Sequence, residues 1–386
     1  MDAMMAERTS TDLFAGKRIV VKVGSALLVD EARGTVHRQW LETLAQDVAA
    51  LRASGKEVVL VSSGAIAVGR RHLALPKTGL TLPQKQAAAA TGMVRLVHAY
   101  QEILGPYDLA VGQVLLTLDD TENRRRYINA RDTLQTLLEG GAVPLINEND
   151  TVATDEIRVG DNDRLAARVA AMISADTLVL LSDIDGLYTA DPKQDPAAAF
   201  IPVVRELTPE IEAMAGAAGS AHGSGGMVTK LAAARICMAA GCRMVIARGG
   251  VENPLAAIDS ERPRTWFLPS ATPNTARKLW IGGSLKTVGT LQVDDGALRA
   301  LNRGKSLLPA GVCAVAGTFQ KGAAVLIEGR AGTLIGRGLV GYSADEVRQL
   351  MGHKTDEIET ILGYRGRDEI IHRDDMVITS NGRDIK

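Results

Sequence analysis

Short runs of β-branched and aliphatic residues alternate with longer amphipathic stretches along the first two thirds of the chain. The short runs predict buried strands, and the longer stretches carry apolar residues three or four positions apart, as helices do. We expect strands at residues 19–23, 58–61, 110–116, 143–146 and 178–181, and helices at 39–52, 83–104, 130–138, 164–173 and 228–240. This alternation indicates an α/β fold, with a mostly parallel open sheet sandwiched by helices.

The pattern changes after about residue 275. Short β-like runs separated by glycines are expected at 285–291, 311–316, 323–328 and 332–340, with a helical stretch at 297–301. Pro263, Pro269 and Pro273 indicate a linker before them. We therefore expect an N-terminal tail (1–16), an α/β domain (17–265), a linker (266–276) and a small β-rich domain (277–380).

The ends of four predicted strands carry small or polar residues: Gly24-Ser25, Ser62-Ser63, Asn147 to Asp150, and Ser182-Asp183. In open α/β sheets, ligands bind beyond the carboxyl ends of the strands. Turns favour the same residue types, so one such end is explained by a simple turn. Four ends together favour a binding site.

Composition and charge narrow the classes of function. The chain has 386 residues, of which 46% are apolar, and 44 basic against 45 acidic residues give a net charge of −1. This balance predicts no polyanion partner for the chain as a whole. Three cysteines make no disulfide framework, which indicates a reducing compartment. With no apolar run near the ~18 residues of a membrane span, and no apolar core in the first 16 residues, we expect a cytoplasmic protein.

Two lysines stand in unusual places. A glycine-rich loop, residues 223–226, precedes a predicted helix whose first turn holds Lys230. Such a loop offers free N–H groups and the positive end of the helix dipole to an anion, and a lysine there is unfavourable unless an anion binds too. Lys22 interrupts an apolar strand and needs an anionic partner if it is buried. A flexible loop and an exposed edge strand are the alternatives.

Carboxylates and amides are dense in two loops, residues 147–150 and 161–163. They suit binding of a substrate ammonium group, positioning of lysines, or help in holding hydrated Mg²⁺, whereas helix capping accounts for only one of the loops. The six histidines lack metal-ligand spacing, and neither standard glycine-rich nucleotide motif is present.

Together these blocks resemble the glutamate 5-kinase family, which has the amino-acid kinase fold. The resemblance rests on residues 22–25, 61–67, 146–150, 159–163, 182–183, 186–192 and 225–230, in the family's order. Residues 306–312 and 372–376 resemble the PUA domain that many bacterial members append. Three positions depart slightly: Ser25, Ala26 and Ser182 stand where Thr, Ser and Thr are common.

The resemblance implies transfer of the γ-phosphoryl group of ATP to the side-chain carboxylate of L-glutamate. The product is L-glutamyl 5-phosphate, the first intermediate of L-proline biosynthesis, and the resemblance also implies feedback inhibition by proline. Mg²⁺ is expected on the ATP phosphates, with no protein metal site. A carboxylate nucleophile is already ionised at pH 7 and needs no general base, which agrees with the absence of a catalytic histidine.

The resemblance also implies residue roles. Lys22 and Lys230 match the family's catalytic lysines, and Asp163 matches the aspartate that positions them. The implied glutamate-binding residues are Ser63, Asp150 and Asn162, with Asp161 and Asn147 as neighbours. The implied ATP-binding residues are Lys22, Ser182, Asp183, Ser224, Gly225, Gly226, Met227, Val228, Thr229 and Lys230.

Three alternatives stay open at this point. A sister kinase acting on acetylglutamate, aspartate, carbamate or uridylate is disfavoured by residues 62–66 and 147–150. RNA binding through the PUA-like domain is disfavoured because 16 basic and 13 acidic residues lie between Arg277 and Lys386, with few aromatics. A scaffold or bifunctional subunit is not excluded, although we expect no fused second enzyme. The resemblance implies a homo-oligomer.

Overall fold

The computed structural model describes residues 11–30, 34–153, 161–217, 226–260, 262–283 and 285–378. The chain forms two compact units. The first holds the residues up to Glu122 together with Asn129–Pro273, and the second holds Asn123–Ile128 together with the chain from Asn274 onward. The predicted limits of the tail, domains and linker stay a prediction. None of the described helices is long and apolar enough to span a bilayer.

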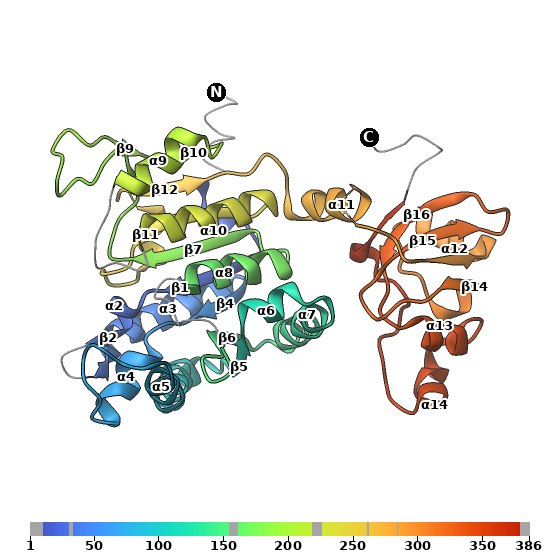
Figure 1. Ribbon diagram of the computed structural model, residues 1–386, viewed down its shortest axis with the longest axis horizontal. Coiled ribbons are helices and arrows are strands. Elements are labelled where there is room, and N and C mark those ends of the chain that lie inside the picture. The colour runs from blue at the N-terminus through green and yellow to red at the C-terminus, as the bar shows by residue number, and fades with distance from the viewer. Residues whose placement is uncertain are drawn as a thin grey trace. The chain divides into compact units, whose positions relative to one another are not determined.

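The first unit is built on an eight-stranded sheet in the order β10-β12-β11-β7-β1-β4-β6-β5 (Figure 1). The strands are β1 (Arg18–Val23), β4 (Glu57–Val61), β5 (Val111–Leu116), β6 (Val143–Glu148), β7 (Thr177–Ser182), β10 (Val203–Val204), β11 (Arg243–Arg248) and β12 (Arg264–Phe267). Neighbouring strands are parallel except for the antiparallel pair β11–β12. The predicted mostly parallel sheet is therefore confirmed.

Helices cover both faces of this sheet. The helices of this unit are α2 (Ser25–Leu28), α3 (Arg38–Ala53), α4 (Ala65–His72), α5 (Leu82–Leu104), α6 (Leu118–Glu122), α8 (Asp161–Met172), α9 (Pro209–Ala217), α10 (Met227–Ala239) and α7 (Arg124–Glu139), whose first residues belong to the second unit. Two short hairpins, β2 (Val29–Asp30) with β3 (Thr35–Val36) and β8 (Leu187–Tyr188) with β9 (Phe200–Ile201), and three 3₁₀ turns at Leu13–Ala15, Gly105–Tyr107 and Ala256–Asp259 complete the unit.

Alternation along β1 decides which residues meet which helices. Ile19, Val21 and Val23 lie in the core cluster that also contains α3 and α5 side chains. Since successive side chains of a strand point to opposite faces, Val20 and Lys22 face the other way. On that face α8 packs against β1 and against α10. The strand pattern thus directs the one lysine of β1 toward the beginnings of two helices.

A close crossing fixes α4 against α5. An added Cβ on Gly69 of α4 would lie 1.8 Å from the carbonyl oxygen of Ala88, and one on Gly92 of α5 would lie 1.8 Å from the carbonyl oxygen of Ala65. Only glycine at both positions allows the two backbones to come this close. The contact sets the position of α4, which starts just beyond the carboxyl end of β4.

The second unit contains a separate five-stranded sheet in the order β14-β13-β15-β16-β17. Its elements are α11 (Pro273–Gly283), β13 (Gly289–Val293), α12 (Asp295–Asn302), β14 (Val312–Gly317), β15 (Ala324–Gly329), β16 (Leu334–Leu339), α13 (Ala344–Leu350), α14 (Ile358–Leu362) and β17 (Met376–Ile378), with 3₁₀ turns at Pro309–Gly311, Thr355–Glu357 and Arg373–Asp375. Apolar side chains such as Leu291, Val325 and Ile327 form its core. This confirms the predicted small β-rich domain.

Candidate active site

A cavity of about 610 Å³ opens where β1, β4, β6 and β7 end. It is lined by many of the residues predicted from the sequence: Lys22, Ser63, Asn147, Asp150, Asn162, Ser182, Asp183 and Lys230. Parallel strands deliver these residues to one place because their carboxyl ends share one edge of the sheet. The four polar strand ends seen in the sequence therefore line a single cavity.

A buried charge cluster contributes two lysines, Lys22 and Lys230, to the cavity wall. Nζ of Lys22 lies 2.6 Å from Oδ1 of Asp163, and Nζ of Lys230 lies 3.0 Å from Oδ2 of the same carboxylate. The Thr229 hydroxyl donates a hydrogen bond to Oδ2 of Asp163, at 3.1 Å, and so adds a third contact to this carboxylate. All three charged residues are at most 8% exposed. Since two ammonium groups share one carboxylate, this cluster carries a net positive charge.

The same arrangement explains the protonation states of the cluster. Burial by itself would raise the pKa of Asp163, but the ammonium groups of Lys22 and Lys230 outweigh it and hold that pKa below its ordinary value. Burial lowers the pKa of Lys22; the Asp163 carboxylate opposes this shift, and Lys230 adds to it. Asp163 is therefore the anion that makes it possible to hold two lysines together out of water.

Helix beginnings supply the cluster. Asp163 is in the first turn of α8, and Lys230 is in the first turn of α10, whose N-cap is Gly226. Met227 and Val228 start α10, and the Val228 side chain is exposed. Ser224 and Gly225 lie outside the described residues, as does the side chain of Asp161. Ser182 at the end of β7 donates a hydrogen bond to the Asp183 carboxylate, at 3.0 Å.

A second set of lining residues, Asn162, Asn147 and Asp150, is called here the acceptor end of the cavity. The Asn162 amide donates to the hydroxyl of Ser63, at 2.9 Å, and to the carbonyl of Ser62. Its own Oδ1 is buried and has no hydrogen-bond partner. The Asn147 amide nitrogen, in the orientation that satisfies it, also lies 2.7 Å from the Ser62 carbonyl. These amides hold the Ser62–Ser63 segment, and the Asn162 Oδ1 faces no donor among the described residues.

Asp150 is the charged member of this acceptor end. It follows β6, is 8% exposed, and burial raises its pKa to about 6. No basic side chain is among the causes of that shift, in contrast to Asp163. A buried carboxylate of this kind is stabilised as an anion when a cation binds beside it.

Sequence reasoning missed several residues of the cavity wall. Arg70 of α4, and Lys77 and Lys85 on the chain that follows, line the same cavity. In the sequence, Arg70 belongs to an ordinary basic last turn of a short helix, Arg70-Arg71-His72. Only the burial of Arg70, at 8% exposure, distinguishes it from its neighbours.

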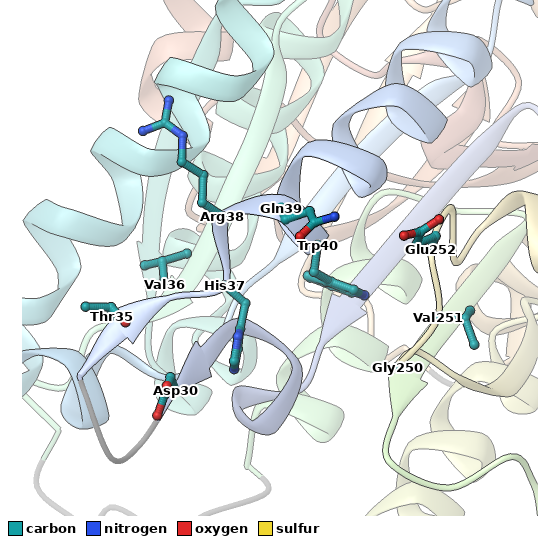
Figure 2. A pocket seen from close by; sticks show the side chains of 10 residues that line it. All are labelled: Asp30, Thr35, Val36, His37, Arg38, Gln39, Trp40, Gly250, Val251 and Glu252. Carbon is teal, nitrogen blue, oxygen red and sulfur yellow. The ribbon is translucent and has the colours of Figure 1, made fainter.

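A second pocket of about 470 Å³ lies in the same unit (Figure 2). The β2–β3 hairpin, the beginning of α3 and residues 250–252 line it, with Trp40 and His37 pointing between them. The Trp40 indole N–H donates to the carbonyl of Gly249, at 2.7 Å. This pocket shares no lining residue with the cavity at the strand ends.

Comparison with known proteins identifies the family. The model of the Amino acid kinase family matches residues 17–248, and that of the PUA domain matches residues 289–362. The chain is 65% identical over 366 residues to the glutamate 5-kinase of Paramagnetospirillum magneticum, covering 95% of this chain and 99% of that protein. It is 60% identical over 364 residues to that of Rhodospirillum rubrum, covering 94% and 97%. The chain belongs to the glutamate 5-kinase family.

Both compact units take part in this likeness. Glutamate 5-kinase 1 of Rhizobium meliloti is 57% identical over 364 residues, covering 94% of this chain and 92% of that protein. All the residues of the buried charge cluster lie within the part matched by the kinase family model. The family resemblance seen in the sequence is therefore confirmed, and the chain is an enzyme of the kinase class.

Proposed function

We propose that this protein transfers the γ-phosphoryl group of ATP to the side-chain carboxylate of L-glutamate, giving L-glutamyl 5-phosphate for L-proline biosynthesis. One observation carries the proposal: a single cavity is lined by both lysines of the net positive Lys22–Asp163–Lys230 cluster and by the Asp150 carboxylate, which has no partner among the described residues. An amino acid with a side-chain carboxylate presents the complementary charges.

The buried cluster suits the chemistry of transfer. A carboxylate oxygen of the acceptor attacks the γ-phosphorus while the bond to the bridging oxygen of ADP breaks, so negative charge is spread over the phosphoryl oxygens. Lys22 and Lys230, both buried, place positive charge beside that group. Asp163 stays ionised and sets the distance between the two ammonium groups.

The acceptor end suits an α-ammonium group. Asp150 supplies a charged acceptor and Asn162 Oδ1 a neutral one. Neither has a hydrogen-bond donor among the described residues. An ammonium group donates to both. Ser63, held by Asn162, is then placed to bind the acceptor chain between the two ends.

ATP fits the beginning of α10 and the end of β7. The free N–H groups of the first turn of α10 and the Lys230 ammonium suit phosphate oxygens. When bound, Mg²⁺ neutralises phosphate charge. Among the described residues no group of three or more His, Cys, Asp or Glu side chains is arranged for a metal. This donor set fits an ion held mainly by phosphates and water, which is how Mg²⁺ usually binds nucleotides.

Three further properties belong to the same proposal. Proline has an ammonium group beside a carboxylate, so it suits the acceptor end and would act as an inhibitor there. We also propose a cytoplasmic homo-oligomer, on the family resemblance and the free cysteines Cys237, Cys242 and Cys313. No role in binding nucleic acid is proposed for the PUA domain.

The direct test is an acceptor assay with ATP, Mg²⁺ and hydroxylamine, which converts an acyl phosphate into a hydroxamate. Hydroxamate formation with L-glutamate, and little with L-aspartate, N-acetyl-L-glutamate or carbamate, is expected. Uridylate gives no acyl phosphate, so its turnover is measured as ADP release and is expected to be low. Turnover of one of the other acceptors in preference to L-glutamate would contradict the proposal. Proline added to the same assay tests inhibition.

A further inference from the structure

A buried arginine on the cavity wall has no partner among the residues that the structure describes. Arg70 is the sixth residue of α4, is 8% exposed and lines the cavity at the strand ends. No hydrogen bond or ion pair joins its guanidinium to the parts of the chain that the structure describes. The carboxylates that also line the cavity, Glu148, Asp150 and Asp183, do not pair with it.

An unpaired guanidinium is an unusual thing to bury. Its charge cannot be removed by deprotonation in a protein, and a buried charge without a partner is strongly unfavourable. Such a group is retained where an anionic group of a ligand pairs with it. The guanidinium fork matches a carboxylate with two parallel hydrogen bonds, which a lysine cannot reproduce.

The backbone around Arg70 is held firmly in place. Gly69, the preceding residue, makes the closest approach to α5, and Gly64 before α4 adopts a left-handed conformation with φ of 93°. An added Cβ on Gly64 would lie 2.8 Å from the Val29 side chain. These contacts orient α4 so that Arg70 lies on its buried face, whereas Arg71 is exposed.

We propose that Arg70 binds the α-carboxylate of the amino-acid acceptor and so selects α-amino acids. The inference rests on the proposed function, because it assigns the one charged group of L-glutamate still without a partner. The side-chain carboxylate meets Lys22 and Lys230, and the ammonium group meets Asp150. Three charged groups of the substrate then face three complementary places in one cavity.

A phosphate oxygen of ATP is the other anion that a guanidinium at this wall could bind. The two sources differ in what they predict. Loss of an α-carboxylate contact weakens L-glutamate and leaves ATP unchanged, whereas loss of a phosphate contact weakens ATP. Loss of a phosphate contact also reduces turnover of every acceptor equally.

The test compares acceptors with and without the α-carboxylate in the full-length protein. The 4-aminobutyrate molecule has the ammonium and reacting carboxylate of glutamate but no α-carboxylate, and the α-amide of L-glutamate has a neutral group there. Steady-state kinetics with hydroxamate trapping are measured for wild type, Arg70→Met and Arg70→Lys. Arg71→Met is the matched control on the exposed side of the same helix. Compounds that turn over too slowly are measured as inhibitors against L-glutamate.

For Arg70→Met, we expect kcat/KM for L-glutamate to fall by roughly 30-fold or more, mostly through KM, as for loss of one partner of a buried charge pair. The values for 4-aminobutyrate and the α-amide should change little, so the preference for L-glutamate collapses. Arg70→Lys should fall between, because it keeps the charge but not the fork. Arg71→Met should behave as wild type, and KM for ATP should stay constant throughout.

Equal losses for all acceptors, or a selective rise in KM for ATP, would overturn the assignment. If Arg70→Met does not fold, Arg70→Lys decides: unchanged discrimination between L-glutamate and 4-aminobutyrate would equally reject it. A wild-type protein without activity toward L-glutamate would instead reject the proposed function itself. The two failures are therefore distinguishable.

Discussion

Two groups of residues in the cavity differ in whether their charges are paired within the protein. At the transfer end, Lys22, Asp163 and Lys230 pair with one another at 2.6 and 3.0 Å before any substrate binds. By contrast, the Asp150 carboxylate, the Asn162 Oδ1 and the Arg70 side chain, grouped here as the acceptor end, line the same cavity and have no such pairing among the described residues. In the proposed function, the lysine cluster is paired within the protein alone, and the acceptor end is paired by the substrate.

The difference matches what each end has to do. Charge at the transferring phosphoryl group changes during the reaction, so preorganised donors are most useful there. The acceptor's charges do not change at its far end, and unpaired partners there reject molecules that lack the matching group. Substitutions at the transfer end should therefore act on kcat, and those at the acceptor end on KM for the acceptor.

The largest effect is expected for Lys230→Met. The substitution removes the net positive charge of the cluster but leaves the Lys22–Asp163 pair intact. We expect kcat to fall by roughly 10²–10³, the range for loss of one preorganised donor, while ATP binding measured by calorimetry weakens much less. Retention of more than about a third of wild-type kcat would remove Lys230 from the mechanism.

A double mutant sharpens this prediction. Lys22→Met/Lys230→Met should be less damaged than the product of the two single effects, because both lysines face the same phosphoryl charge. Strict multiplication of the two losses would indicate that they act on separate steps. The measurement is again steady-state hydroxamate formation.

At the acceptor end, Asp150→Asn should raise KM for L-glutamate by roughly 10²-fold through loss of a charged partner. KM for ATP should stay near its wild-type value. The same variant should raise the thermal stability of the free protein slightly, because it removes a buried carboxylate whose ionisation is unfavourable. Equal changes in both KM values would point to a structural role for Asp150.

The acceptor end should also be more sensitive to acid. Burial raises the pKa of Asp150 to about 6, so below that pH the free protein carries a neutral carboxyl group there. An ammonium group needs the ionised form, and KM for L-glutamate should therefore rise about tenfold per unit as the pH falls below about 6. Above about 6 it should level off. In Asp150→Asn this step should disappear, whereas a persistent step would assign it to another group.

The sequence predicted some strands of the sheet and missed others. The strands β1 and β6 lie within two residues of the predicted runs because a strand covered on both faces must be continuously apolar. The strands β11 and β12 were not predicted, although residues 244–247 form an apolar run. Helix α4 was missed because it is short and holds Gly69 in its middle, and its position depends on contact with α5.

The candidate site divides in a similar way. Polar residues at strand ends can be assigned to one cavity, because parallel strands bring these ends together. Burial of Lys22 could also be suspected from its apolar neighbours. Arg70 could not be found this way, because nothing in a local pattern says that one of two adjacent arginines is buried and unpaired. That property exists only once α4 is fixed on α5.

The smallest effect on catalysis is expected from removing the second unit. All the charged residues of both ends of the cavity lie in the first compact unit, as does the core cluster that supports β1 and α3. A chain ending at Pro273 should therefore form glutamyl hydroxamate with kcat within about threefold of the full chain, as expected for a domain with its own core. Residues 123–128 belong to the second unit, and the truncation removes the rest of that unit. A lower melting temperature of the truncated protein is therefore expected. A truncated protein that is folded by circular dichroism but inactive would show that activity depends on the second unit. In partly active truncations, the KM values for ATP and L-glutamate would show which of the two substrates is affected.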